Sequence, residues 1–555
     1  MRIYRRVPLT IVLALLPCAA LAGPVSPPQQ EGAGRMSHRW LFIYNDMSDP
    51  AQVDRDLALF PRAQAAGYNG VVFKADVAPS RVDALKAAAQ QYGLALVPLV
   101  MEGSRDQNNT EGVPARDALF IAHGDAASFV PDNPTKLSGG DFENVVGNRF
   151  PDWTFQENEG VGTFADHDVV HGGSTAVRME NLAAARHGNC RLSQQVKLQP
   201  FRQYHISIWA KTQDLRAGQV GLEVNAPDTD ESISYQTFRV RPTQDWTRYD
   251  IGFNSLAHTD ASFFLGVWAG KSGRIWWDDL VIEEIGLVNV LRRPGCPVTV
   301  RGETGAIYEE GADFEQIADP ELHIWRAYHQ PPAIHLTPGT RIGEGERLRV
   351  TYYHSVIIYN DKLSWCLTEP AIFDEWRQQV KLANDRFHPP AFFMYHDEIR
   401  VANWCQSCRS KHMTSGQLLA ENVRRAAAIV REIRPDAELW DWNDMFDPMV
   451  NAKDPYYLCN GGMKGSWEGL DSGIGIVNWA TGLKGENCRF FADEGEQQIL
   501  AGYYDYDEDG SGIAEWIKNT QTVPNIVGAM YTTWEDKYSA METWAHRAWG
   551  DPAAK

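Results

Sequence analysis

The sequence predicts an α/β fold, a (β/α)8 TIM-like barrel interrupted by an all-β insertion. Three observations lead to this prediction. Strand and helix patterns alternate over residues 37–115, the helical period nearly vanishes from about residue 119 to about residue 359, and the alternation then returns. Alternating strands and helices are typical of parallel α/β sheets and barrels, whereas short alternating runs with turn residues are typical of β-sandwiches.

The first barrel segment, residues 37–115, has a β-α-β-α-β pattern. Its strands are predicted at Trp40–Tyr44, Gly70–Phe73 and Leu94–Val100, each an apolar run bounded by turn or polar residues. Asp49 and Pro50 supply an N-cap and a favoured first residue for the first helix. Pro61 is expected to kink or split that helix, because proline removes a backbone donor and clashes with the preceding turn.

The insertion is predicted to hold two units. Residues 136–285 open with Gly-Gly-Asp-Phe-Glu and close with Trp-Trp-Asp-Asp-Leu-Val-Ile, and this pattern resembles the jelly-roll carbohydrate-binding modules. The flanking residues, 116–135 and 286–345, are predicted to form a small β module in which the jelly roll is nested. The resemblance implies a structural calcium ion held by Glu143 and Asp279.

The second barrel segment, residues 346–555, contains the clearest helix, in which Leu419, Val423, Ala426, Val430 and Ile433 recur at helical spacing. Five strand candidates end in aromatic and acidic or polar residues; they lie within 392–398, 438–444, 474–479, 499–505 and 527–536. With the run from Val350 to His354, the chain offers nine barrel strand candidates where eight are needed. The extra run belongs either to the β insertion or to the site.

Residues 1–22 have the pattern of a cleavable leader, and residues 23–36 that of a linker. Arginines precede an apolar run, and Ala20-Leu21-Ala22 before Gly23 has the form of a signal-peptidase site. We therefore expect a periplasmic or secreted protein without a membrane span. The formal net charge of −20 argues against nucleic-acid partners. The 19 tryptophans and 20 tyrosines suit stacking on sugar rings, although most aromatic side chains are expected in cores.

Asp397 and Glu398, at the end of an apolar run, are the strongest candidates for chemistry. The carboxyl ends of barrel strands meet at one rim, where active sites are built. Two adjacent carboxylates repel each other, which favours one raised pKa and a general acid. A solvated strand end is the structural alternative. Carboxylates and tryptophans converging on one rim, without a nucleotide-binding loop or a nucleophile elbow, fit glycoside hydrolysis best.

This half of the chain resembles the catalytic barrel of glycoside hydrolase family 20, the β-N-acetylhexosaminidases. The resemblance lies in the Asp-Glu strand end, the later tryptophans, a Tyr beside an Asp and the final Trp-Glu. It implies a retaining enzyme without a catalytic cofactor, in which the acetamido oxygen of a terminal N-acetylhexosamine attacks the anomeric carbon. Glu398 is then acid and base, Asp397 holds the acetamido nitrogen, and Tyr504 (or Tyr503) holds its oxygen. The implied substrate-binding residues are Trp442, Trp479, Trp534 and Glu535, with Asn443, Asp444 and Asp505 beside them.

The sequence departs from the family pattern at two places. The usual His-x-Gly-Gly before Asp-Glu is here Met-Tyr-His, and the first strand has no sugar-gripping arginine, for which Asn45, Asp46 or Lys74 is a candidate substitute. Sugar preference, N-acetylgalactosamine or N-acetylglucosamine, therefore stays open. His354 and His396, at strand ends, are either hydrogen-bonded rim residues, or sugar-hydroxyl contacts or partners that tune Glu398.

Two other functions stay open, and so does the chemistry of Cys405 and Cys408. The protein is alternatively a glycosidase on non-acetamido sugars, with Asp444, Asp505 or Glu535 as nucleophile, or a non-catalytic glycan-binding protein. The Cys-x-x-Cys motif suits half a zinc site, a redox pair or a disulfide. For an exported protein we favour a disulfide or free structural thiols over a metal.

Overall fold

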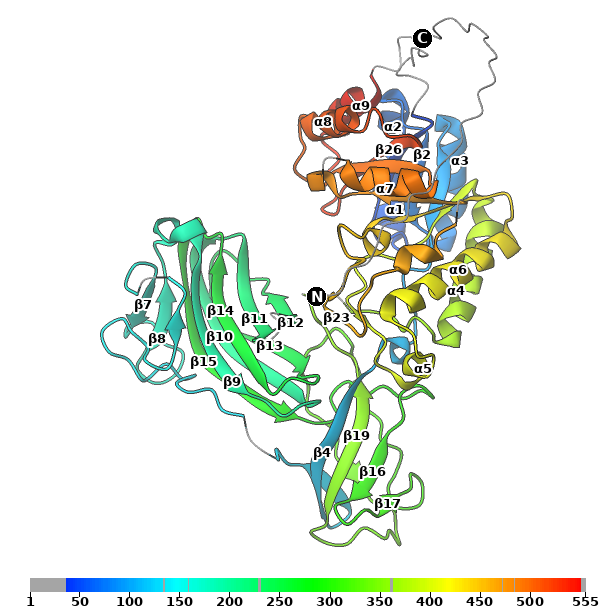
Figure 1. Ribbon diagram of the computed structural model, residues 1–555. Coiled ribbons are helices and arrows are strands. Elements are labelled where there is room, and N and C mark those ends of the chain that lie inside the picture. Colours follow the sequence, from blue (N-terminus) through cyan, green and yellow to red (C-terminus); the bar gives the residue numbers. More distant parts are fainter. Residues whose placement is uncertain are drawn as a thin grey trace, which may run out of the picture.

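The computed structural model describes residues 36–132, 135–157, 159–227, 231–359, 363–471, 473–483 and 485–550. The predicted leader, and the predicted linker except Met36, lie outside these residues. No helix within the described ranges is long and apolar enough to cross a membrane. The described chain forms a barrel, a two-sheet sandwich and a smaller sheet, which lies at the bottom of Figure 1.

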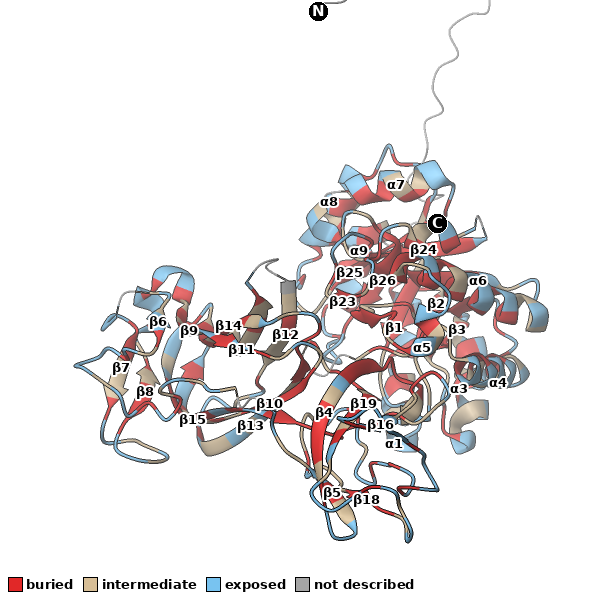
Figure 2. Cartoon of the chain, turned by 60° about the horizontal axis from the view of Figure 1, so that its bottom comes forward, coloured by how far each residue is buried: buried red, intermediate tan, exposed pale blue. Residues whose placement is uncertain are grey.

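Eight parallel strands close into a barrel whose interior is filled by side chains. Phe42, Phe393, Trp440 and Met530 are fully or almost fully buried there, and Figure 2 shows the strands as mostly buried. In their order around the barrel the strands are β1 (His38–Ile43), β2 (Gly70–Lys74), β3 (Ala95–Leu99), β20 (Ala391–Phe393), β22 (Glu438–Trp442), β24 (Ile474–Asn478), β25 (Gln498–Tyr503) and β26 (Ile526–Thr532).

The predicted class, an α/β fold with a (β/α)8 TIM-like barrel interrupted by an all-β insertion, is wrong. The described residues are mostly β: only 23% of them are helical, and eight of their 26 strands belong to the barrel. The connection from β22 to β24 contains only short 3-10 turns at 444–446 and 466–469 besides the two-residue strand β23. The insertion contributes most of the strands. Its strand content therefore exceeds the helix content that the periodicity of the two barrel segments predicts.

The helices pack outside the barrel. Pro61 occupies the first turn of a second helix, so the predicted split into two helices is confirmed. Thr414 and Gln417 form a capping box at the start of the long helix that the periodicity predicts. The helices are α1 (Pro50–Leu57), α2 (Phe60–Ala65), α3 (Val82–Tyr92), α4 (Pro370–Phe387), α5 (Gln406–Arg409), α6 (Ser415–Ile433), α7 (Glu486–Glu494), α8 (Ser511–Asn519) and α9 (Met541–Trp549).

Two antiparallel five-stranded sheets form the sandwich at the left of Figure 1. Alternate residues of its long strands point inward, among them Tyr204, Ile206 and Ile208, and they share one apolar core. One sheet contains β13 (Gln244–Asn254), β10 (Gln203–Arg216), β15 (Ser272–Ile285), β8 (Ala176–Met179) and β7 (Thr163–Asp166). The other contains β12 (Glu231–Thr237), β11 (Gln219–Ala226), β14 (Asp260–Trp268), β9 (Cys190–Lys197) and β6 (Thr154–Phe155).

A six-stranded sheet joins the sandwich to the barrel. Its strands come from both sides of the sandwich in sequence: β17 (Ile307–Tyr308), β16 (Thr299–Gly302), β19 (Arg347–His354), β4 (Val113–His123), β5 (Ala126–Phe129) and β18 (Ile334–His335). The candidate strand from Val350 to His354 is therefore part of the insertion and not of the barrel. A further two-residue pair, β21 (Val401–Ala402) with β23 (Leu458–Cys459), lies in the loops beyond the barrel strands.

Candidate active site

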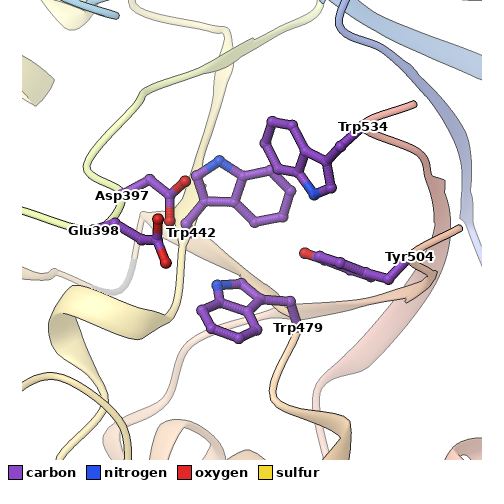
Figure 3. Close-up of a pocket in the computed structure, with 6 residues that line it drawn as sticks. All are labelled: Asp397, Glu398, Trp442, Trp479, Tyr504 and Trp534. Carbon is purple, nitrogen blue, oxygen red and sulfur yellow. The ribbon is translucent and has the colours of Figure 1, made fainter. Parts of the chain in front are cut away.

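A cavity of about 270 Å³ lies at the carboxyl-end rim of the barrel. Six side chains from five strand ends line it: Asp397, Glu398, Trp442, Trp479, Tyr504 and Trp534. In Figure 3 the two carboxylates lie on one side of the cavity, and the Tyr504 hydroxyl points toward them from the other side. All six were predicted from the sequence, and the rim geometry brings them together because parallel strands end at the same edge.

Both adjacent carboxylates reach the cavity because the strand has ended before them. Successive residues of a strand point to opposite faces, but β20 stops at Phe393, and Asp397 and Glu398 follow in irregular backbone. Glu398 has a left-handed backbone with φ of 47°, which is unusual for a residue with a side chain. Tyr503, Tyr504 and Asp505 also have positive φ, at 80°, 45° and 65°. Such strain clusters at functional sites.

The buried carboxyl of Asp444 holds Asp397 and Glu398, the acid pair, in place. It is fully buried, and its Oδ2 atom accepts hydrogen bonds from the Glu398 amide at 3.0 Å and the Asn451 side chain at 2.8 Å. Burial raises the pKa of Asp444 to about 6, with the charge of Glu398 adding to the effect, while hydrogen bonds, including one with Asp397, oppose it. Asp444 therefore positions the two carboxylates and does not line the cavity.

Glu398 is connected to the sandwich through a chain of contacts. Its Oε1 atom lies 2.6 Å from Nη2 of Arg400, and the Arg400 guanidinium stands over the Tyr359 ring at 4.3 Å. The Tyr359 ring stacks on Tyr235 of β12, with centroids 4.7 Å apart. The Tyr235 amide also donates to the carbonyl of Ile358 at 2.7 Å. The edge strand of the sandwich thus buttresses the residues that hold Glu398.

The aromatic walls are fixed by polar residues behind them. Asp505 accepts hydrogen bonds from the Trp534 amide at 2.9 Å and from the Thr533 hydroxyl. Asn443 accepts one from the Trp479 amide at 3.0 Å and donates to the buried Asp447. Asp505 and Asn443 were predicted as substrate contacts, but their hydrogen bonds are those of positioning residues.

The histidine predictions need correction. The ring of His396 is buried, with Nδ1 2.6 Å from Asp441 and Nε2 2.9 Å from Asn422. His354 lies in β19, where Asn254 of the sandwich contacts its Nε2 and the Ser355 carbonyl contacts its Nδ1, and burial lowers its pKa to about 4. Both nitrogens of each ring are thus engaged within the protein, so neither histidine is available for a sugar hydroxyl.

Three further predicted contacts lie outside the cavity lining. Asp46 is exposed and accepts hydrogen bonds from Ser48. Glu535 is exposed and pairs with Lys537 at 2.5 Å. Lys74 pairs with Glu102 at 3.0 Å and lies over the Tyr44 ring at 4.0 Å. Of the three, Lys74 lies in a network that reaches the cavity wall.

That network contains residues which the sequence analysis missed. The Tyr44 ring packs edge-on against Trp534, with centroids 5.0 Å apart, and stacks on Tyr395 at 6.1 Å. Its hydroxyl donates to Glu102. Tyr44 directly follows β1, and Glu102 follows β3. The strand-end rule that identified the acid pair would have found both, had it been applied to the first barrel segment.

The expected calcium ligands do not fit a cation as they are arranged. Glu143 accepts hydrogen bonds from the amides of Ser174 and Thr175 at 2.8 and 3.0 Å and from the Ser174 hydroxyl at 2.6 Å. Asp279 lies 2.6 Å from Nδ1 of His171. N–H donors from residues 171–175 thus take the place that oxygen ligands would have in a calcium site.

Comparisons with known proteins identify one part of the chain. Residues 136–270 match the family model described as "Carbohydrate binding domain", so the chain contains such a domain within its sandwich. No curated protein matches the chain at a significant level.

Several solved structures are similar to part of the chain. A structure described as "CBM4 structure and function" has 15% identity and a TM-score of 0.21, covering 27% of this chain and 100% of that one. A TmCBM61 complex with β-1,4-galactotriose has 17% identity and a TM-score of 0.21, covering 27% and 97%. The tailspike protein 4 domain of bacteriophage CBA120 has 17% identity and a TM-score of 0.21. This match covers 27% of our chain, which spans only 21% of the tailspike domain.

Proposed function

We propose that this protein is a retaining glycoside hydrolase that removes terminal N-acetylhexosamine from glycans, using the acetamido group of the substrate as the nucleophile. The observation that carries the proposal is the cavity, in which two carboxylates face a tyrosine hydroxyl and three tryptophans form the remaining walls. Its volume of about 270 Å³ lies just below the usual range for small-molecule sites. This favours a single sugar unit at a chain end.

The proposed reaction has two steps. In the first, Glu398 protonates the glycosidic oxygen, the bond from that oxygen to the anomeric carbon breaks, and the acetamido oxygen bonds to the anomeric carbon. Asp397 accepts the acetamido N–H and stabilises the positive charge of the resulting ring. In the second, Glu398 removes a proton from water, which attacks the anomeric carbon and reopens the ring. Two inversions at one carbon give net retention.

Tyr504 suits the role of donor to the acetamido oxygen. Burial raises its pKa well above the usual range, and the nearby carboxylates Asp397 and Asp444 raise it further. The phenol therefore keeps its proton at neutral pH and remains able to donate a hydrogen bond. Trp442 and Trp479 offer flat apolar faces for the acetyl group and the sugar ring.

We expect Tyr504→Phe to lower kcat on an N-acetylhexosaminide by about 100-fold, as loss of one preorganised donor does in other enzymes. KM should change little, because the donor acts chiefly on the charge that develops in the transition state. Tyr506→Phe is the matched control, since Tyr506 is 72% exposed and does not line the cavity. Equal losses in the two variants would contradict the assignment.

The proposed function is tested with four aryl β-glycosides, those of N-acetylgalactosamine, N-acetylglucosamine, galactose and glucose. Turnover of the acetamido sugars alone, inhibited by a thiazoline that mimics the cyclised intermediate, is the expected result. Turnover of the plain hexosides would instead indicate a protein nucleophile.

The second candidate function is a glycan-binding protein without catalysis. The observation that favours it is the match of residues 136–270 to a carbohydrate-binding domain, since a binding domain is the part of the chain with identified relatives. Silence on all four aryl glycosides, together with binding of glycans on an array, would support this candidate and reject the hydrolase.

A further inference from the structure

A buried cluster of three thiols and one carboxyl lies beside the barrel, apart from the cavity. The side chains are Glu111, Cys366, Cys405 and Cys408, and their ligand atoms all lie within 4.8 Å of one another. All four residues are at most 2% exposed. In the described part of the chain this is the only such group of three or more histidine, cysteine or acidic side chains.

We propose that Glu111, Cys366, Cys405 and Cys408 bind a structural zinc ion. The Cys366 sulfur lies 3.6 Å from each of the other two sulfurs, and Oε2 of Glu111 lies 3.6 Å from the Cys408 sulfur. Zinc binds thiolates tetrahedrally at about 2.3 Å, which sets neighbouring sulfurs roughly 3.8 Å apart. The observed spacing is within a few tenths of an ångström of that value.

The geometry does not favour a disulfide. Cys366 is equally far from Cys405 and Cys408, and all three sulfurs are those of free cysteines. A bond between any two of them would require the sulfurs to approach to about 2.05 Å and would leave the third thiol beside a buried carboxyl. The sequence-based preference for a disulfide or structural thiols considered only the Cys405-x-x-Cys408 pair, and the structure adds Cys366 and Glu111.

The second layer of contacts orients the carboxyl toward the sulfurs. Oε1 of Glu111 accepts hydrogen bonds from the amides of Trp404 and Cys405, both at 2.7 Å. Its other oxygen is thereby directed at the sulfur cluster. Metal ligands are commonly held in this way by hydrogen bonds to the atom that does not bind the metal. The short helix α5 begins after Cys405 and contains Cys408, so one turn presents both sulfurs.

A bound cation would offset the negative charge that these four side chains acquire when they ionise to bind it. Three thiolates and a carboxylate would carry four negative charges in an apolar environment, which is unfavourable without a compensating cation. Arg293 is buried nearby, but its guanidinium already pairs with Glu369 at 3.0 Å and donates to the carbonyls of Asn108 and Thr110. A divalent ion supplies the charge that Arg293 alone does not.

The ion would fasten three segments that are distant in sequence. Glu111 precedes β4, where the chain leaves the barrel; Cys366 precedes α4, where it returns; and Cys405 follows Glu398 by seven residues. The same junction is held by the Cys366 amide, which donates to the carbonyl of Asn109 at 2.9 Å. The zinc site would thus fix the base of the insertion and the loop that continues from the acid pair. The proposal does not depend on the proposed hydrolase function.

Metal analysis of the purified full-length protein tests the proposal. We expect stoichiometric zinc in the wild type and loss of it in Cys366→Ser and Cys408→Ser. Glu111→Gln, which keeps the size of the side chain, should retain the fold and bind zinc more weakly. Cys190→Ser is the matched control, because Cys190 is an equally buried free thiol in the sandwich, and its zinc content should equal that of the wild type.

Two measurements on the wild type keep the test decisive if a ligand variant fails to fold. Replacement of zinc by Co²⁺ should give the visible absorption of a tetrahedral thiolate site. Alkylation of the folded protein, mapped by peptide mass spectrometry, should modify Cys366, Cys405 and Cys408 only after a strong chelator is added. Either of two results would overturn the proposal. The first is a purified wild type that contains no metal. The second is a wild-type mass lower by two hydrogen atoms, with a disulfide mapped between two of these three thiols.

Discussion

Replacing Glu398 with glutamine is expected to lower kcat on N-acetylhexosaminides by about 10²- to 10⁴-fold, the usual contribution of a general acid–base residue. The reason is that the amide of the new side chain neither donates a proton to the leaving oxygen nor accepts one from water. The loss should grow as the leaving group becomes more basic, because a nitrophenolate leaves without protonation whereas an alcohol does not. Measurement of kcat for a series of aryl and alkyl glycosides tests this dependence.

Addition of azide to the Glu398→Gln variant should restore turnover of activated substrates. Azide is an anion and attacks the anomeric carbon without a base, so the product is the glycosyl azide with retained β configuration. An α-azide would instead identify Glu398 as a nucleophile. Binding of substrate should survive the change, since Trp442, Trp479 and Trp534 still enclose the cavity.

Glu432→Gln is the control for this experiment. Glu432 lies in the last turn of α6 and does not line the cavity, and its exposed carboxylate pairs with Arg377 at 2.6 Å. Exposed pairs of this kind contribute at most about 1 kcal/mol to stability. Activity equal to that of the wild type is expected, and a comparable loss in both variants would remove Glu398 from its assigned role.

The cavity could be predicted from the sequence because it follows from a simple geometric rule. Trp442, Trp479, Tyr504 and Trp534 each follow an apolar strand, and parallel strands bring such ends to one rim. The same rule fails at His354. This histidine also ends an apolar strand, but β19 belongs to an antiparallel sheet of the insertion. The sequence pattern of a single strand does not distinguish the two settings.

Side-chain direction and long-range contacts were the other limits. His396 stands one residue before Asp397, yet its ring is buried against Asp441 and Asn422 instead of lining the cavity. Cys366 lies 39 residues before Cys405. Glu111 precedes the insertion, whereas the three cysteines follow it. No short spacing motif therefore includes Cys366 or Glu111. The predicted fold class was wrong for a different reason. Local periodicity shows where helices occur, but it does not show what fraction of the residues they contain.

Replacing His396 with glutamine is expected to destabilise the barrel by about 3 kcal/mol, toward the lower end of the cost of breaking a buried ion pair. His396 and Asp441 are 2% and 0% exposed. Loss of the imidazole removes its hydrogen bond to Asp441, although the amides of His396 and Trp442 still donate to that carboxylate. His396 directly precedes Asp397, so loss of its contact with Asp441 should also displace Asp397 and Glu398 and reduce activity.

The pH dependence distinguishes this ion pair from packing alone. Burial lowers the pKa of His396, but the charge of Asp441 and the hydrogen bonds to Asp441 and Asn422 outweigh it, and the net pKa is raised. A raised pKa in the folded state stabilises the fold fully below the unfolded pKa of about 6.5, and this stabilisation is lost as the pH rises through the folded pKa. The free energy of unfolding of the wild type should therefore decline above about pH 6.5, and the variant should lack this decline.

Hydrogen exchange of the peptide spanning residues 391–400, measured from pH 5 to pH 9 and corrected for the intrinsic rate, reports the stability of this segment. The double variant His396→Gln/Asp441→Asn is the matched control, because it removes the buried carboxylate together with its partner. It should be more stable than the single variant, as expected when an unpaired buried charge is the main cost. The double variant could instead be as unstable as the single one. In that case the segment that positions Asp397 is held by packing of the imidazole against Trp376 and Phe446, and not by the charge of the imidazole.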